Sequence, residues 1–393
     1  MRKVHEPDFI RPDDDLRFFT ELPKPELHLH LDGSLDPTLA LELARTRKVE
    51  APRDWAGMRA ALVAPERCVD QADLLRAFDL PIALLQDEEA LERLADHVVR
   101  AKAAENVRYM ELRWGPHLHT AKGLTQSQVI AAVARGASSA AAEVGVQVRL
   151  IVTALRSHSV DENRALAVAA VAAKDLGVGA FDLAGREAAF PDPLTFKDAF
   201  DVARSGGLAI TLHAGEWGGA AQVRRALEVA PARIAHGAVA VDDAALCDEL
   251  IARGVVLDLC PSSNVQAAIV PGYGDFPILA LHRRGVRVTL NTDDLIVSDL
   301  TLSEEYLRVR RRLGATVTEL LALARTGYEV AFLDEAERRP LLAAFDAWVE
   351  ERLGRYGGLV TRTGNLSANH LRIRHNAARG QRCAGPLRPT RLG

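Results

Sequence analysis

The sequence predicts a (β/α)8 barrel, and the number and spacing of its apolar runs carry that prediction. Eight short runs rich in β-branched residues or leucine recur along the chain, and a stretch with helical spacing follows each of them. These runs are residues 26–30, 109–113, 148–154, 178–183, 208–213, 233–236, 255–259 and 286–291. Their separation after the second run fits one strand, one crossover helix and two loops, which favours parallel pairing. Because an open doubly wound sheet has the same local pattern, the choice depends on the count of eight.

Extra helical segments interrupt and then follow this repeat. Residues 36–47 and 71–106 have helical patterns between the first and second predicted strands. Helices inserted there lie at the carboxyl ends of the barrel strands, where they can cover a pocket. After the last strand, residues 302–314, 316–333 and 338–354 are predicted to be closing helices.

The composition is typical of a globular protein. Its 393 residues are 48% hydrophobic and 26% charged, with no apolar run long enough to cross a membrane. Residues 1–19 lack the apolar segment and cleavage site of a secretory signal, so we expect a cytoplasmic protein. The four cysteines lie far apart without a C-x-x-C pair, which argues against a disulfide framework or a cysteine-built zinc site.

We expect a single barrel domain over residues 1–355 and a basic, disordered tail over residues 356–393. The tail contains seven arginines and no Lys, Asp or Glu, although the whole chain has a net charge of −4. It is rich in Gly, Pro and polar residues and lacks sustained periodicity. Because the rest of the chain is acidic and repels phosphate, we expect no nucleic-acid partner, and no membrane partner either. The sequence leaves the oligomeric state open.

Two histidines in the first predicted strand suggest a metal site. Side chains alternate along a strand, so His28 and His30 point to the same face, a geometry that suits two imidazoles on one metal. A buried histidine is more often a core residue, so this pair alone is weak support. His117 and His119 have the same spacing, but they follow a Gly-Pro pair in a loop where alternation is not assured.

Further candidate ligands occur at the ends of later strands. His213 ends the fifth predicted strand, His236 ends the sixth, and Asp293 follows the eighth. The carboxyl ends of barrel strands meet at one face, so these side chains are expected to gather there. Neutral imidazoles and one carboxylate are ligands that catalytic zinc accepts while leaving a position for water. Zinc lowers the pKa of that water from about 16 toward about 7, so hydroxide is available at neutral pH.

Three more polar residues are candidates for proton transfer. Glu216 lies three residues beyond His213, where a carboxyl group can donate a proton to substrate, and His236 can accept or steer a proton from the water. Asp294 follows Asp293 directly and can hold the attacking hydroxide or a ring nitrogen. Taken singly, these residues are equally compatible with a solvated loop glutamate, a core histidine and two helix-capping aspartates.

Seven segments, in this order, resemble the signature of the adenosine deaminase family of metal-dependent amidohydrolases. The segments are LPKPELHLHLDGSL, YMELRWGP, FDLAGRE, TLHAGEWGG, RIAHG, CPSSN and VTLNTDD, and the similarity covers about residues 20–335. The resemblance implies one zinc ion per chain, and the residues that match its ligands are His28, His30, His213 and Asp293. It also matches Glu216 to the proton donor to purine N1, and His236 with Asp294 to the pair that orients the attacking hydroxide.

The resemblance further implies the substrate contacts and the reaction. Asp294 matches the contact to purine N7, Gly185 the backbone donor to N3, and Asp32, with His30 nearby, the ribose contact. The implied reaction is hydrolytic deamination of a 6-aminopurine nucleoside, first of all adenosine or 2′-deoxyadenosine, to inosine or 2′-deoxyinosine and ammonia. Zinc deaminases that edit nucleic acids have H-x-E and P-C-x-x-C motifs, and neither occurs here, so a small nucleoside is the expected substrate.

Three departures from the family pattern leave the exact substrate open. Arg186 replaces an acid, Trp217 follows the glutamate of HAGE, and Leu295 replaces a proline. A cation and an indole near the substrate favour a nucleoside with an acidic group, such as aminodeoxyfutalosine, but both residues are equally compatible with the rim of the pocket. Adenine is less favoured, because adenine-type members tend to have glutamate where Asp32 stands.

Two other classes of protein are alternatives. A two-metal amidohydrolase would need a lysine at the end of the fourth strand, and that strand ends in FDLAG. An inactive barrel that serves as a binding protein is disfavoured because all seven polar site residues are present.

Overall fold

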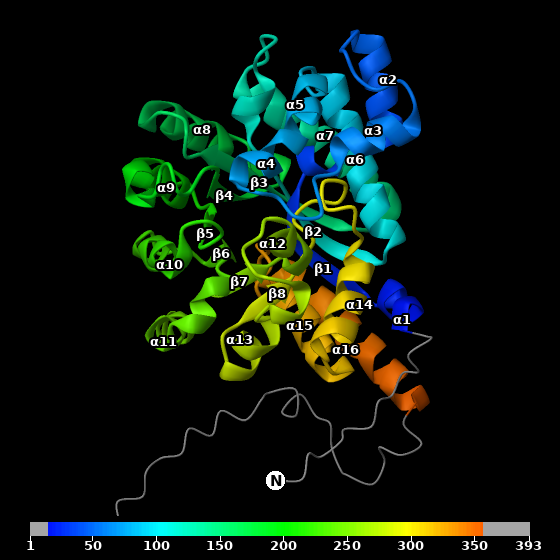
Figure 1. Cartoon of the computed structure of the whole chain (residues 1–393), viewed down its shortest axis with the longest axis vertical. Coiled ribbons are helices and arrows are strands. Elements are labelled where there is room, and N and C mark those ends of the chain that lie inside the picture. Colours follow the sequence, from blue (N-terminus) through cyan, green and yellow to red (C-terminus); the bar gives the residue numbers. More distant parts are fainter. Residues whose placement is uncertain (1–14, 357–393) are drawn as a thin grey trace, which may run out of the picture.

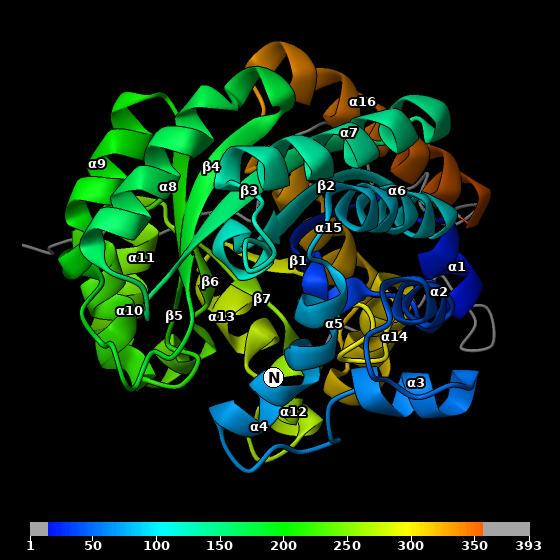
Figure 2. The ribbon, with the colours of Figure 1, turned by 90° about the horizontal axis from the view of Figure 1, so that it is seen from above.

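The computed structural model describes residues 15–356, which form a barrel of eight strands surrounded by helices (Figures 1 and 2). The strands are β1 (Lys24–His30), β2 (Val107–Trp114), β3 (Gln147–Leu155), β4 (Val178–Ala184), β5 (Ala209–Ala214), β6 (Arg233–His236), β7 (Val256–Leu259) and β8 (Val288–Leu290). Each strand pairs in parallel with the next one along the chain. The predicted (β/α)8 barrel and the positions of all eight predicted strands are therefore confirmed.

Backbone hydrogen bonds just beyond β8 close the ring against β1. Leu29 forms a parallel bridge with Asp293. The His30 N–H donates to the Asp293 carbonyl at 2.7 Å, and the Asp293 N–H donates to the His28 carbonyl at 3.0 Å. The closure of the barrel thus joins the HLH segment directly to the paired aspartates.

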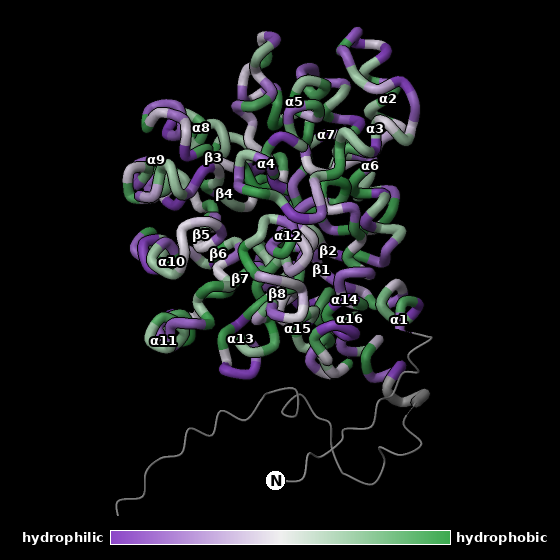
Figure 3. Tube along the Cα trace, viewed as in Figure 1, coloured by the Kyte–Doolittle hydropathy of each residue, from purple (hydrophilic) through white to green (hydrophobic). Residues whose placement is uncertain are grey.

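Seven helices alternate with the strands and pack against the outside of the barrel. They are α6 (Glu88–Ala104), α7 (Gln126–Val144), α8 (Val160–Ala172), α9 (Lys197–Ser205), α10 (Gly219–Glu228), α11 (Ala244–Arg253) and α13 (Ile278–Arg284). Capping boxes at Thr125 and Ser159 begin α7 and α8, and Gly145 and Gly254 in the left-handed region end α7 and α11. The helices carry both hydrophobic and hydrophilic residues, as expected for helices with one face on a core (Figure 3).

The chain between β1 and β2 contains the predicted extra helices. They are α2 (Pro37–Arg47), α3 (Trp55–Leu62), α4 (Gln71–Leu75) and α5 (Asp79–Leu84), so the patterned stretch 71–106 forms several helices. This inserted segment lies beside α12 (Pro261–Gln266), the helix that follows β7 (Figure 2). The Cys68 N–H donates to the Gln266 carbonyl at 2.7 Å. A small apolar cluster also joins the two segments, and it consists of Ala64, Cys68, Leu74, Ala77, Ala267 and Val297.

The remaining helices are α1 (Asp15–Glu21), which precedes β1, and α14 (Leu302–Leu313), α15 (Val317–Glu329) and α16 (Glu335–Tyr356), which follow β8. They include the three predicted closing helices, and α16 begins earlier than its predicted start. The predicted basic tail from residue 357 onward lies outside the described residues. Within residues 15–356, no helix is long and apolar enough to cross a membrane.

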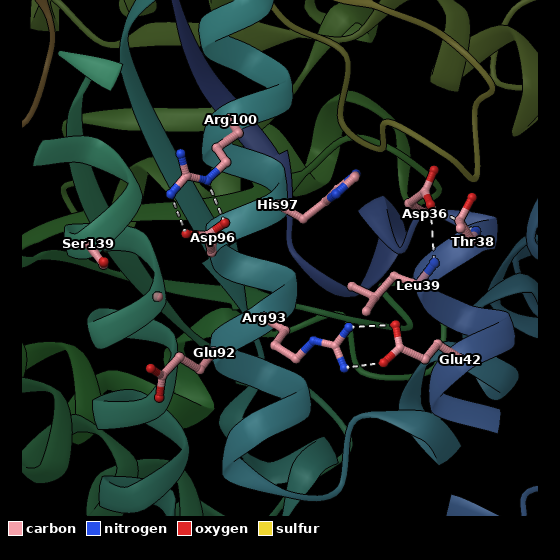
Figure 4. Close-up of a pocket in the computed structure, with 11 residues that line it drawn as sticks. Asp36, Thr38, Leu39, Glu42, Glu92, Arg93, Asp96, His97, Arg100 and Ser139 are labelled. Atoms are coloured by element: carbon pink, nitrogen blue, oxygen red, sulfur yellow. Dashed lines mark hydrogen bonds and ion pairs between the residues drawn. The ribbon is translucent and has the colours of Figure 1, made fainter. Parts of the chain in front are cut away.

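A groove of about 700 Å³ lies on the outer surface between α2, α6 and α7 (Figure 4). Arg93 forms two hydrogen bonds with Glu42 across it, and Arg100 does the same with Asp96 along α6. None of the predicted site residues lines this groove. The predicted site residues lie elsewhere, at the carboxyl ends of the barrel strands.

Candidate active site

The structure brings the four predicted metal ligands together at the carboxyl end of the barrel. His28 Nε2 lies 2.9 Å from Asp293 Oδ1, and His30 Nε2 lies 3.3 Å from the same oxygen. His30 Nε2 is also 3.2 Å from Nε2 of His213, the second-last residue of β5. One ligand atom from each of the four residues lies within 4.8 Å of the other three. The ends of two strands, β1 and β5, and the turn after β8 therefore supply one compact group of potential ligands.

Two residues of the site have strained backbones. Asp293 has a φ of 71° and His236 a φ of 67°, both in the left-handed region that non-glycine residues avoid. Such strain costs on the order of 1–3 kcal/mol and persists only where the surroundings hold the backbone. For Asp293 the two hydrogen bonds with β1 do so, and they aim its carboxylate at the histidines.

The ligand group fits a divalent metal such as zinc. Burial lowers the pKa of His28 and of His213, so both imidazoles are neutral and can offer a lone pair. Burial acts to raise the pKa of Asp293, but electrostatic interactions with His28 and His236 and hydrogen bonds with His28 and His30 outweigh it and lower that pKa, so this carboxylate is ionised. His28 is fully buried, so its imidazole is shielded from water beside the Asp293 carboxylate. Three imidazoles and one carboxylate are a ligand set that catalytic zinc takes.

Two further contacts orient these ligands, and the sequence analysis did not identify either. Asp182, buried at the end of β4, lies 3.2 Å from His213 Nδ1, so that Nε2 faces the site. Ser263, on α12, donates from Oγ to Asp293 Oδ2 at 2.7 Å. Two features of the sequence could have pointed to these residues. Asp182 is an acid inside an otherwise apolar strand, and Ser263 belongs to a pair of serines just after the end of β7.

Glu216 is a largely buried carboxyl group beside this cluster. Burial, together with the negative charge of Asp293, raises its pKa to about 8. Its Oε1 lies 3.8 Å from His236 Nε2. Because the pKa lies above neutrality, Glu216 holds a proton that it can donate at pH 7.

The loop that carries Glu216 is held by the carboxylate of Glu187. This carboxylate accepts hydrogen bonds from the backbone N–H groups of Gly215 at 2.7 Å, Trp217 at 2.8 Å and Gly218 at 2.8 Å. Glu187 is buried, so these three charge-assisted bonds are shielded from water. The sequence analysis did not single out Glu187, which follows Arg186 in the FDLAGRE segment.

The three residues that depart from the family pattern differ in exposure and in what they pack against. The side chain of Arg186 is exposed. Trp217 is half-buried and packs against the apolar cluster of the inserted segment. Leu295 is half-buried against the main hydrophobic core. Of the three, Trp217 is the one that packs against this cluster.

Asp294 and Asp32 supply two more carboxylates at the same face. Both are buried, and in each of them Oδ1 has no hydrogen-bond partner. Burial and the charge of Asp293 raise the pKa of Asp294. A Cβ on Gly33 would lie 1.7 Å from Asp294 Oδ1, so only glycine leaves room for this carboxylate.

The last two predicted site residues also lie at strand ends. His236 ends β6, and its Nδ1 lies 3.1 Å from Asn264 Nδ2 on α12, which holds the ring. Gly185 follows β4 with a φ of 107°, a conformation that favours glycine. All the predicted site residues therefore gather at the carboxyl face of the barrel.

The chain is similar to known adenosine deaminases over most of its length. The family model for adenosine deaminase matches residues 23–348. Among curated proteins, the chain is 33% identical over 326 residues to an adenosine deaminase from Enterococcus faecalis, which covers 83% of this chain and 96% of that protein. It is 36% identical over 323 residues to one from Clostridium perfringens, which covers 81% of this chain and 97% of that protein.

Solved structures with the same fold include related deaminases. An adenine deaminase from Arthrobacter aurescens has a TM-score of 0.78 and 27% identity, covering 84% of this chain and 99% of that one. An amidohydrolase from Burkholderia ambifaria with bound Zn has a TM-score of 0.80 and 25% identity, covering 90% and 97%. These relationships and the His/Asp cluster support a metal cofactor. The chain belongs to the adenosine deaminase family and is an aminohydrolase.

Proposed function

We propose that this chain removes the 6-amino group of adenosine or 2′-deoxyadenosine by zinc-dependent hydrolysis and releases ammonia. The observation that carries the proposal is the convergence of three imidazoles and one carboxylate next to the protonated carboxyl group of Glu216. The adenosine deaminases among its relatives support the choice of a purine nucleoside.

In this proposal four residues hold one zinc ion per chain: His28, His30, His213 and Asp293. Zinc, when bound there, would lower the pKa of a water molecule so that the water can attack carbon C6 of the purine at neutral pH. Asp182 and Ser263 keep two of the ligands in place through their hydrogen bonds.

The chain's own acids and bases then move the protons. Burial lowers the pKa of His236, so its neutral ring can accept the proton of the attacking water. Glu216 donates its proton to purine N1, which makes C6 a better electrophile and helps ammonia to leave. Asp294 orients the attacking oxygen, and because its pKa is raised it also has a proton to donate to N7.

Three groups place the rest of the substrate. The backbone of Gly185 donates to purine N3, and its φ of 107° turns the chain at this point. Asp32, together with His30, contacts the sugar of the nucleoside. A small-molecule purine is thus the expected partner of the site.

The alternative substrates differ in what they need from the pocket. Adenine lacks a sugar for Asp32, although the similarity to the Arthrobacter adenine deaminase keeps it a candidate. A nucleoside with an acidic group, such as aminodeoxyfutalosine, would need a cation directed at the substrate, and the Arg186 side chain is exposed. Adenosine and 2′-deoxyadenosine are therefore placed first.

The test is ammonia release from adenosine, 2′-deoxyadenosine, adenine, AMP and aminodeoxyfutalosine, together with the metal content of the protein. We expect about one zinc per chain and fastest turnover of the first two compounds. His28→Ala should lose the metal, whereas the control His282→Ala, on α13 at the outside of the barrel, should keep it. A protein without metal that added zinc does not activate would contradict the proposal.

A further inference from the structure

His119 is a fully buried histidine at the carboxyl face of the barrel that the proposed reaction does not use. It ends the short 3-10 helix η4 (Pro116–His119), which follows β2. Its Nδ1 lies 2.9 Å from the carbonyl oxygen of Leu85, just after α5 in the inserted segment. Since a carbonyl only accepts, Nδ1 must carry the hydrogen.

The other ring nitrogen is left without a partner. His119 Nε2 is buried and makes no hydrogen bond. Burial lowers the pKa of His119, although the charge of Asp32 and the Leu85 carbonyl act to raise it. The ring is therefore neutral at pH 7, and Nε2 presents a lone pair that seeks a donor.

Asp32 presents a second acceptor of the same kind. It follows β1, the strand next to β2, and its charge acts on the His119 ring. Asp32 Oδ1 is buried and also has no hydrogen-bond partner. A buried acceptor left unpaired costs about 1–3 kcal/mol, so two of them just beyond the ends of neighbouring strands indicate that a donor group belongs there.

We propose that His119 is a substrate-binding residue, whose Nε2 accepts a hydrogen bond from a sugar hydroxyl of the nucleoside while Asp32 accepts another. This inference rests on the proposed function, which brings a nucleoside to the site with its sugar at Asp32. A ribose offers several hydroxyl donors on one ring, which suits two neighbouring acceptors.

The two acceptors, on His119 and Asp32, also select the class of substrate. A free nucleobase has no hydroxyl for these acceptors, so both remain unsatisfied in its complex. A phosphate on the recognised hydroxyl removes the donor and brings negative oxygens next to a carboxylate. Free nucleosides are therefore favoured over nucleobases and over nucleotides esterified at that hydroxyl.

A purely structural role for His119 would be to tie the inserted segment to η4. Gln86 makes that connection independently, since its Nε2 donates to the Leu118 carbonyl at 2.8 Å and its Oε1 accepts from the Ala121 N–H at 3.0 Å. The two roles can be separated by substitution. In His119→Asn the amide nitrogen can still donate to the Leu85 carbonyl, but nothing replaces Nε2.

The experiment measures kcat and KM of the zinc-loaded wild type and His119→Asn for adenosine and for its 2′-, 3′- and 5′-deoxy analogues. We expect kcat/KM for adenosine to fall about 10–100-fold, mainly through KM. The analogue that lacks the recognised hydroxyl should lose less than about threefold, because the wild type has no bond there to lose. His119→Gln, which can place an oxygen near the Nε2 position, should recover part of the loss.

The control is His117→Asn in the same turn, where the half-buried ring packs against His158, and it should leave the pattern across the analogues unchanged. An equal loss for all four nucleosides, or no loss for any, would overturn the role of His119. A wild-type enzyme that releases ammonia from none of the nucleosides would instead overturn the proposed function, and this inference with it.

Discussion

The imidazole of His213 donates from Nδ1 to the carboxylate of Asp182, whose Oδ2 lies 3.2 Å away on the neighbouring strand. Thr153 donates to the same oxygen at 3.1 Å, and Arg113 Nη1 lies 3.6 Å from it. Burial acts to raise the pKa of Asp182, but His213 and Arg113 outweigh it, so the pKa is lowered and the carboxylate is ionised. This bond fixes which nitrogen of His213 faces the other ligands.

Asp182→Asn is therefore expected to weaken metal binding about 10–100-fold while the barrel stays folded. The amide cannot hold the His213 N–H as an ionised carboxylate does. Competition with a chelator measures the affinity. Thr153→Val is the matched control, because it removes one neutral bond to Asp182 and keeps the charge, and it should change the affinity far less. Equal affinities for all three proteins would contradict the orienting role.

Glu216→Gln is expected to keep the metal and to lose about 10²–10⁴-fold in kcat, since the amide has no acidic proton to donate. The pH profile gives a second readout. The group acts in its protonated form, and burial raises its pKa to about 8, so activity should be present below that pH and fall as pH rises through it. Glu228→Gln, on the exposed face of α10, should retain both the rate and the profile. Unchanged turnover in the Glu216 variant would remove this residue from its role.

Glu187→Gln tests the support of the Glu216 loop. The amide keeps one acceptor oxygen but places an NH₂ group against backbone N–H donors, so part of the three-bond arrangement is lost. We expect kcat to fall about 10-fold or more with the metal content unchanged, because a small displacement of a catalytic group is costly. Arg186→Ala, in the exposed neighbour, should retain adenosine turnover. Loss of metal in Glu187→Gln would show that its effect is not confined to the loop.

Gly33→Ala is expected to abolish most activity. A Cβ there would lie 1.7 Å from Asp294 Oδ1, so the carboxylate or the turn after β1 must move. Gly274→Ala is the control, because a Cβ at Gly274 meets nothing within 4 Å. Kinetics and thermal unfolding of both variants check the prediction. A Gly33→Ala enzyme with normal kcat would show that the Asp294 carboxylate is not needed in its present place.

Much of the barrel could be predicted because the signals are local. Side-chain alternation placed His28 and His30 on one face of β1, and apolar runs located all eight strands. The division of the stretch 71–106 into several helices was harder to predict, because amphipathic spacing alone does not show where short helices end.

Residues that act through contacts between distant segments could not be predicted. Glu187 has the composition of an ordinary loop acid, and only the fold shows its carboxylate accepting from the loop of Glu216. His119 was noted for its spacing, but the spacing did not indicate that its ring would be buried with Nε2 unpaired.

The sequence by itself determined the strands, the kinds of side chain at their ends and the family resemblance, because periodicity and motif order are properties of neighbouring residues. Only the tertiary structure decided which of those side chains meet. Asp293 reaches His28 because barrel closure pairs the segment after β8 with β1. Such contacts depend on the register and packing of the whole barrel, which no local pattern contains.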